Sequence, residues 1–361
     1  MRSGTRRTGT AFALVLGMTA VLGGCSWGES SDEAPLVGLA MPTTEQSRWV
    51  ADGDNLEAQF TSLGYQVDKK YAENDVAGQV AQVQAMIDEG ADALVIGSVD
   101  GKALAGVLAQ AHAAGIPVIS YDRLIRDSKD VDFYASFDNA RVGVMQGNAL
   151  LRGLGILDAT GAPTGKKGPF NIEVFAGSPD DNNATVFYDG AMSVLKPYLD
   201  SKVLVVPSGQ VAREDVAIAS WDPKTGGKRM DSLLGAYKNR HLDGILAPND
   251  GLAQAAIASA KSLGYVPVVT GQDSEIPAVK SVADGEQYMT VYKDTRQLAE
   301  VTVAMVSALL KGTQPEVNDT ATYDNGVKVV PSYLLAPQEV NKDNYRRLLV
   351  DGGYYTAEEV G

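Results

Sequence analysis

Polar side chains that can hydrogen-bond a small ligand stand directly after several apolar runs of the sequence. Asp122 and Arg123, for example, follow the run Pro117–Tyr121 (PVISY). Residues of similar chemistry in the same kind of position are Arg48, Asp181, Asn183, Asn249, Asp273 and Lys293. Carboxylate, amide and guanidinium groups form paired hydrogen bonds, and the rings of Trp49 and Trp221 offer flat apolar faces. This combination suits a compact polyhydroxylated ligand, because each hydroxyl both donates and accepts while the C–H faces are apolar.

The Asp and Asn residues of this set also have a simpler explanation. Asp and Asn are common helix N-caps, so any one of them after a strand predicts only the start of a helix. The pair Asp122-Arg123 fits that explanation least, because Arg is a poor cap. A glycosidase stays open as an alternative, since it needs only two carboxylates at a set separation. The sequence has no G-x-G-x-x-G after a strand, no phosphate-binding loop and no G-x-S-x-G.

The composition excludes several classes of protein. The 361 residues include 31 Lys and Arg against 45 Asp and Glu, for a formal net charge of −14, which argues against nucleic-acid binding. One Cys cannot form an intramolecular disulfide or a multi-thiolate metal centre. Two His are too few for a His-rich metal centre. We therefore expect neither a metal nor a cofactor.

The N-terminus predicts export. Three arginines precede the apolar run Ala11–Leu22, which at twelve residues is shorter than the roughly 20 that a membrane-spanning helix needs. Small residues and Cys25 follow, so residues 1–24 have the pattern of a cleaved signal peptide. The junction Leu22-Gly23-Gly24-Cys25 resembles a bacterial lipobox, in which the Cys is lipidated. The alternatives are an ordinary secretory signal with an incidental Cys, or a short buried helix.

The segment after the predicted cleavage site is polar and has no periodicity. Residues 25–35 therefore predict a flexible tether between a lipid on Cys25 and the folded body. Removal of residues 1–24 takes away three arginines and no acidic residue, which changes the formal net charge to −17. The predicted location is the outer face of the cytoplasmic membrane, with contact through the lipid alone.

From Leu36 onward, short apolar runs alternate with stretches of helical spacing. Val76, Val80, Val83 and Ile87, for example, follow the 3.6-residue repeat of one helix face. Alternating strands and helices predict a parallel sheet covered on both sides. The pattern restarts after Phe133–Phe137, which indicates two α/β units in tandem. Ligands bind beyond the carboxyl ends of parallel strands, and the polar residues described above lie there.

Motifs spread along the chain in order resemble those of one family. They are AMPTTEQSRW (40–49), YDRLIR (121–126), SFDNARVGV (136–144), GSPDDNNA (177–184), PND (248–250), VYKDTR (291–296) and NGVKVVPSYLL (325–335). Together they resemble the periplasmic sugar-binding proteins of ABC importers of the ribose and xylose type. The resemblance implies an α/β fold of two Rossmann-like lobes with parallel sheets, joined by a hinge of three crossovers (a type I periplasmic binding protein). The implied first lobe is 36–137 plus about 293–322, and the second is 138–292 plus about 323–361.

The resemblance also implies roles for individual residues. Trp49 is expected to stack on one face of a sugar. The other implied sugar contacts are Arg48, Asp122 and Arg123 from the first lobe, Asp181, Asn183, Trp221, Asn249 and Asp273 from the second lobe, and Lys293 from a crossover. The implied function is that of a non-enzymatic monomer that captures an aldose monosaccharide and delivers it to an ABC permease. The alternative is a sugar sensor that presents its closed form to a signalling receptor.

Overall fold

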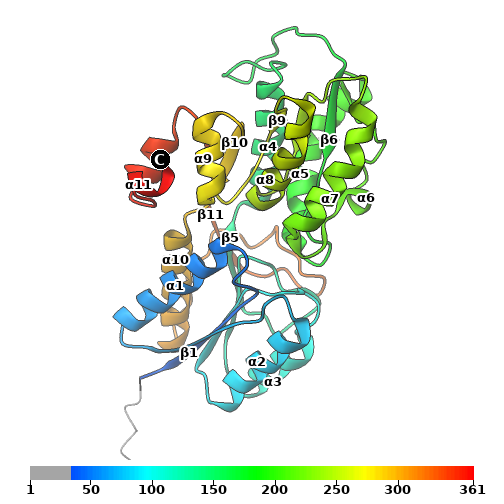
Figure 1. Cartoon of the computed structure of the whole chain (residues 1–361). Helices are drawn as coiled ribbons and strands as arrows, with labels where there is room; N and C mark the ends of the chain where they lie inside the picture. The colour runs from blue at the N-terminus through cyan, green and yellow to red at the C-terminus, as the bar shows by residue number, and fades with distance from the viewer. Residues whose placement is uncertain (1–33) are drawn as a thin grey trace, which may run out of the picture. The chain divides into compact units, whose positions relative to one another are not determined.

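The computed structural model describes residues 34–361, and Figure 1 shows their course. The predicted signal peptide, Cys25 and nearly all of the predicted tether lie outside the described residues. Within the described range, no helix combines the length and the apolar character that crossing a membrane requires.

The first lobe is built on a six-stranded, entirely parallel sheet with the strand order β11-β5-β4-β3-β1-β2. Its strands are β1 (Leu36–Met41), β2 (Gln66–Tyr71), β3 (Ala93–Ile96), β4 (Val118–Tyr121), β5 (Phe133–Phe137) and β11 (Ser332–Leu335). Its helices are α1 (Ser47–Ser62), α2 (Val76–Asp88), α3 (Ala105–Ala113) and α10 (Thr295–Leu310). The sheet has an apolar cluster on each face, as expected for parallel strands buried on both sides.

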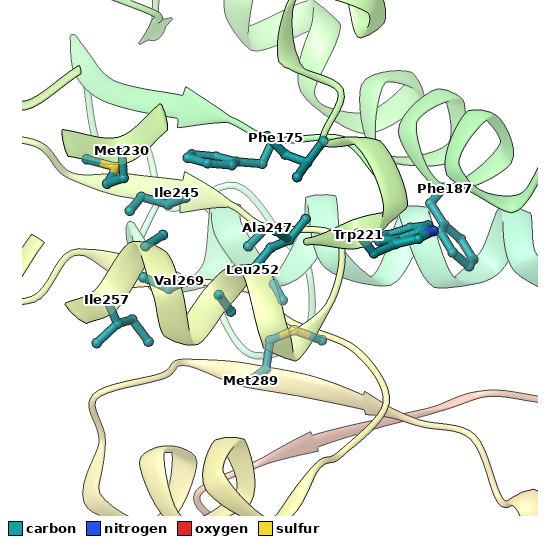
Figure 2. Packing of buried hydrophobic residues seen from close by; sticks show 14 of the residues in the cluster. Phe175, Phe187, Trp221, Met230, Ile245, Ala247, Leu252, Ile257, Val269 and Met289 are labelled. Atoms are coloured by element: carbon teal, nitrogen blue, oxygen red, sulfur yellow. The ribbon is translucent and has the colours of Figure 1, made fainter. Parts of the chain in front are cut away.

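The second lobe has a four-stranded parallel sheet with the order β7-β6-β8-β9. Its strands are β6 (Phe170–Val174), β7 (Leu204–Val205), β8 (Gly244–Leu246) and β9 (Val268–Val269). Its helices are α4 (Asn139–Gly153), α5 (Asn182–Asp200), α6 (Arg213–Val216), α7 (Pro223–Leu234), α8 (Asp250–Ala260) and α9 (Ile276–Asp284), with 3₁₀ turns at Ala219–Trp221, Gly235–Tyr237 and Lys261–Leu263. Figure 2 shows its core, in which Phe175 and Met230 pack above Ile245 and Val269.

Two glycines allow α4 and α5 to pack very closely. A Cβ atom on Gly143 would lie 2.1 Å from the carbonyl oxygen of Phe187, and one on Gly190 would lie 2.5 Å from that of Ala140. No larger residue fits at either position without a shift of the backbone. This contact matters for the site, because α5 carries Asn183 and Phe187.

The chain passes between the lobes three times, after β5, after β10 (Met289–Tyr292) and after β11. Strand β10 does not extend the parallel sheet but pairs antiparallel with β12 (Gln338–Asn341). These passages agree with the predicted three-crossover hinge.

The expected lobe boundary near residue 322 differs from the observed pairing. Strand β11 hydrogen-bonds to β5 and so lies in the first lobe, whereas the sequence assigned it to the second. The strand-like run Val327–Val330 forms only one isolated bridge, between Asp324 and Val329. Backbone pairing decides the lobe to which a strand belongs, and apolar content alone does not reveal the partner.

The last twenty residues form a tail that packs on α9. A π-helical turn (Arg346–Val350) and the short helix α11 (Ala357–Val360) follow β12. Leu349 and Val360 are buried with Val279 of α9 in a small apolar cluster of their own. Figure 1 shows α11 beside α9 at the end of the chain.

Candidate functional site

A cavity lies at the carboxyl ends of the strands, and its walls come from both lobes. It contains about 320 Å³ of space not filled by protein atoms, part of which is open to solvent. Its lining residues are Gln46, Arg48, Trp49, Asp122, Arg123, Asp181, Asn183, Phe187, Trp221, Asn249, Gln272, Asp273 and Lys293. All ten residues that the sequence proposed as ligand contacts are therefore gathered around one cavity, and their role in binding stays a prediction.

Arg48 stands in the first turn of α1 and is surrounded by carboxylates. Its Nη2 lies 2.5 Å from Oδ2 of Asp122, its Nε 3.1 Å from Oδ2 of Asp52, and its Nη1 3.7 Å from Oδ1 of Asp273. Burial raises the pKa of Asp52 to about 6, although Arg48 acts in the opposite direction. The guanidinium thus ties α1 to groups from both lobes.

Asp122 follows β4 directly and has a left-handed backbone, with φ of 59°. Three groups hold its carbonyl oxygen, which accepts hydrogen bonds from Tyr134 Oη (2.6 Å), Ser136 Oγ (2.8 Å) and Asn183 Nδ2 (2.9 Å). Such a backbone is stable only where its surroundings determine it. Burial alone would raise the pKa of the Asp122 carboxyl, but Arg48 and Lys293 outweigh burial and lower it to about 2. The side chain is therefore an ionised hydrogen-bond acceptor at neutral pH.

Trp49 and Arg123 form one wall of the cavity. The guanidinium groups of Arg48 and Arg123 each lie 5.1 Å from the centre of the Trp49 ring, within the range of a cation–π contact. The indole Nε1 of Trp49 donates to Oε1 of Gln46 at 3.1 Å. Arg123 also donates from Nη1 to the carbonyl oxygen of Ser98 at 3.0 Å. These contacts hold the indole and both cations in fixed orientations.

Asp181 organises the opposite wall. It caps α5, where Oδ1 accepts from the backbone N–H of Asn183 at 2.8 Å. Its Oδ2 accepts from Nε1 of Trp221 at 3.2 Å and lies 3.0 Å from Nε of Arg123. Burial raises the pKa of Asp181, and the positive charge of Arg123 opposes that effect. Figure 2 shows the Trp221 ring beside Phe187, with 6.4 Å between the two ring centres.

The two asparagines differ in how much hydrogen-bonding capacity they keep for a ligand. Asn183 donates to the carbonyl oxygen of Asp122, and its Oδ1 accepts from Asn139 Nδ2 at 3.0 Å and lies 3.2 Å from Tyr134 Oη. Asn249 caps α8, where its Oδ1 accepts from the N–H of Leu252 at 3.1 Å. Asn183 therefore mainly fixes the wall, whereas the Nδ2 group of Asn249 is available to the cavity.

Lys293 lies on the crossover that follows β10 and joins the carboxylates of both lobes. Its Nζ lies 2.9 Å from Oδ1 of Asp273 and 3.9 Å from Oδ2 of Asp122, and the side chain is 2% exposed. The cavity lining holds three cations (Arg48, Arg123, Lys293) and three carboxylates (Asp122, Asp181, Asp273). The lining therefore holds as many cationic side chains as carboxylate side chains.

Three lining residues were not predicted from the sequence as ligand contacts: Gln46, Phe187 and Gln272. Phe187 follows Asn183 by four positions on α5, so helical spacing places both on one face and could have identified it. Gln272 is buried, donates from Nε2 to the carbonyl oxygen of Pro248 at 3.1 Å, and has no hydrogen-bond partner for Oε1 among the described residues. No sequence pattern marks Gln46 or Gln272.

The described residues offer no metal centre. Nowhere between residues 34 and 361 do three or more His, Cys, Asp or Glu side chains cluster in a way that could hold a metal ion. The cavity lining instead presents many hydrogen-bond donors and acceptors, together with two indole rings.

Comparisons with known proteins agree with this architecture. Residues 37–314 match the model of the periplasmic binding protein domain. The chain is 55% identical over 331 residues to the multiple sugar-binding periplasmic receptor ChvE of Rhizobium radiobacter, covering 90% of this chain and 92% of the relative. It is 50% identical to the multiple sugar-binding periplasmic protein SbpA of Azospirillum brasilense, with 97% of each chain covered.

A solved structure shows the same fold. The ABC transporter solute-binding protein of Clostridium phytofermentans with bound β-D-glucose is 48% identical, with a TM-score of 0.86 over 90% of this chain and all of the other. The family consists of binding proteins, which agrees with the expectation of a non-enzymatic role. With its two lobes of parallel sheets and its three crossovers, the chain belongs to the periplasmic binding protein family and has the type I fold.

Proposed function

We propose that this protein is the extracytoplasmic receptor of an ABC sugar importer and captures a neutral monosaccharide between its lobes. The observation that carries the proposal is that three cations and three carboxylates line one cavity together with Trp49 and Trp221. The hydroxyl groups of a sugar can donate to the carboxylates and accept from the cations, because each hydroxyl both donates and accepts. A charged sugar would add an unpaired charge to a lining that has equal numbers of cations and carboxylates, so the cavity favours an uncharged sugar.

The relatives support both the ligand class and the transport role. Two of them are multiple sugar-binding periplasmic proteins, and the solved structure is an ABC transporter solute-binding protein with bound β-D-glucose. A pyranose is therefore the expected ligand, and several pyranoses are expected to bind.

Calorimetry tests the ligand class. A soluble form that begins at Ser26 is titrated with D-glucose, D-galactose, D-xylose, L-arabinose, D-fucose and D-ribose, with D-glucuronate and D-glucosamine as charged controls. Binding of at least one neutral pyranose, with much weaker binding of both charged sugars, is the expected result. Failure of every neutral pyranose to bind would falsify the proposal. Loss of uptake of that sugar on deletion of the gene, with retained sugar-dependent signalling, would establish transport as the role.

The proposal includes a lipid anchor on Cys25, which fits an exported chain that carries a single Cys. The test is labelling of growing cells with an alkyne fatty acid. The wild-type protein is expected to carry the label and to sediment with membranes, whereas Cys25→Ser is expected to do neither. Absence of the label from the wild-type protein would refute the lipid anchor but would not affect the proposed sugar-binding role.

A further inference from the structure

The ligand cavity depends on a strained turn that carries Asp273. Asp273 and Ser274 are consecutive non-glycine residues in the left-handed region, with φ of 94° and 52°. Side chains disfavour this conformation, and it persists only where the surrounding structure determines it. The position of the Asp273 carboxylate, 2.9 Å from Lys293, therefore depends on whatever holds the turn.

Groups of the second lobe hold the three N–H groups of the turn. The N–H of Asp273 donates to the carbonyl oxygen of Val291 at 2.8 Å, and that of Ser274 to Oγ1 of Thr290 at 3.1 Å. The N–H of Glu275 donates to Oδ2 of Asp250 at 3.0 Å. Val291 and Thr290 belong to β10, so the turn is tied to the strand that leads to the second crossover.

The C-terminal tail supplies a fourth restraint. The hydroxyl of Tyr355 donates to the carbonyl oxygen of Ser274 at 3.0 Å. Tyr355 is separate from the residues that line the cavity, so its contact reaches a ligand only through the turn. Its ring packs against Tyr354 with 4.8 Å between centres, and both belong to the apolar cluster around Leu349.

The neighbouring tyrosine of the tail contacts the other lobe. The hydroxyl of Tyr354 lies 3.2 Å from Oγ1 of Thr295, and its ring packs under the guanidinium of Arg296 at 5.1 Å. Nη1 of Arg296 also donates to the carbonyl oxygen of Gly353 at 2.7 Å. Thr295 and Arg296 form the first turn of α10, which packs in the first lobe and begins two residues after Lys293. Adjacent residues of the tail thus contact opposite sides of the hinge.

We propose that Tyr355 is a positioning residue for the ligand contact Asp273, and that the tail 342–361 links the geometry of this contact to the first lobe at the hinge. The inference rests on the proposed sugar-binding function. It assigns a part in sugar binding to the Tyr355 hydroxyl, which does not contact the sugar. The tail therefore sets sugar affinity as well as completing the fold.

The test compares Tyr355→Phe with Tyr345→Phe. Both rings belong to the same apolar cluster, but the Tyr345 hydroxyl makes no hydrogen bond within residues 34–361. Tyr355→Phe is expected to weaken binding of the best neutral pyranose about three- to tenfold, mainly through faster dissociation, as loss of one hydrogen bond implies. Tyr345→Phe is expected to bind like the wild type, and the two variants are expected to have similar melting temperatures without sugar.

A double-mutant cycle separates positioning from a general structural effect. In an Asp273→Asn background, Tyr355→Phe is expected to cause less than a twofold change in affinity, because its target carboxylate is gone. Equal effects in both backgrounds, or wild-type affinity in Tyr355→Phe, would overturn the inference and leave the sugar-binding function untouched.

Hydrogen exchange tests the same restraint without any ligand. The amides of Asp273, Ser274 and Glu275 are expected to exchange at least threefold faster in Tyr355→Phe than in the wild type or Tyr345→Phe. Unchanged exchange would refute the inference even for a protein that bound none of the sugars, a result that would refute the proposed function separately.

Discussion

Arg123 of the first lobe and Asp181 of the second form an ion pair across the cavity, with 3.0 Å between Nε and Oδ2. Both side chains are buried, and Asp181 holds the indole of Trp221 through the same oxygen. The side chains proposed to bind sugar therefore form hydrogen bonds and ion pairs with one another across the two lobes. A ligand has to exchange these pairings for its own hydroxyl contacts, which penalises a sugar whose hydroxyls point elsewhere.

Asp181→Asn is expected to weaken sugar binding about 10- to 100-fold, because loss of hydrogen bonds to charged groups costs about 1.5–3 kcal/mol. An asparagine has only one acceptor oxygen, so it cannot both accept from the N–H of Asn183 and serve Arg123 and Trp221, as the two oxygens of Asp181 do. Calorimetry measures the change. The matched control is Asp180→Asn at the preceding, exposed position, for which wild-type affinity is expected. Equal affinities of the two variants would contradict the assignment of Asp181 to the site.

Gly177→Ala is expected to damage the site without any direct contact with a ligand. A Cβ atom at Gly177 would lie 1.9 Å from the Trp221 ring, so the indole would have to leave its position. We expect at least a tenfold loss of affinity and a changed tryptophan emission spectrum. Gly106→Ala is the control, because nothing lies within 4 Å of a Cβ atom there. Wild-type binding by Gly177→Ala would show that the Trp221 position is unimportant.

Arg48→Met is expected to lower the free energy of unfolding by about 3–5 kcal/mol, since it leaves buried carboxylates without their cation. Urea unfolding of the ligand-free protein measures the loss. Arg141→Met, at an exposed position of α4, is expected to change stability by less than about 0.5 kcal/mol. Asp52→Asn is expected to restore part of the stability of Arg48→Met. A loss below about 1 kcal/mol in Arg48→Met would argue against this electrostatic role.

Glu275 is expected to make stability depend on pH. Burial raises the pKa of its carboxyl from 4.5 to about 7, and the charge of Asp273 adds to this effect. Between these values the folded protein binds more protons than the unfolded chain, so the free energy of unfolding falls as pH rises, by at most about 1.4 kcal/mol per pH unit. Below pH 4.5 this contribution is complete, and above pH 7 it is lost.

Urea unfolding at a series of pH values measures that slope. Glu275→Gln is expected to flatten it between pH 4.5 and 7 relative to the wild type. Glu300→Gln, at an exposed position of α10, is expected to keep the wild-type slope. Because Asp52, whose pKa is raised to about 6, titrates in all three proteins, the difference between curves isolates Glu275. Identical slopes in the wild type and Glu275→Gln would contradict the prediction.

Much of the site could be located from the sequence, because carboxyl ends of parallel strands meet at one edge. Asp122-Arg123, Asn249 and Asp273 are far apart in the chain, yet each follows a strand of a parallel sheet or, for Asp273, the loop beyond one. The structure gathers them at one cavity. The order of strands and helices was predictable for the same reason, since each parallel strand needs a crossover.

The remaining features depend on contacts that no local pattern encodes. Gln46 and Gln272 are neutral amides whose orientation depends on single partners, Trp49 and the carbonyl oxygen of Pro248. The lobe of β11 was predicted wrongly because its partner β5 precedes it by about 200 residues. A short apolar run carries information about burial but none about such a distant partner.

The place of β11 in the first sheet also governs the order in which the nascent chain can fold. Strand β5 lacks one of its two neighbours until Leu335 has been synthesised, because the entire second sheet lies between them in the sequence. A chain that stops before Ser332 therefore exposes an unpaired strand edge, a template for association with other chains. Completion of the first lobe is a late event of synthesis, even though that lobe begins at the first described strand.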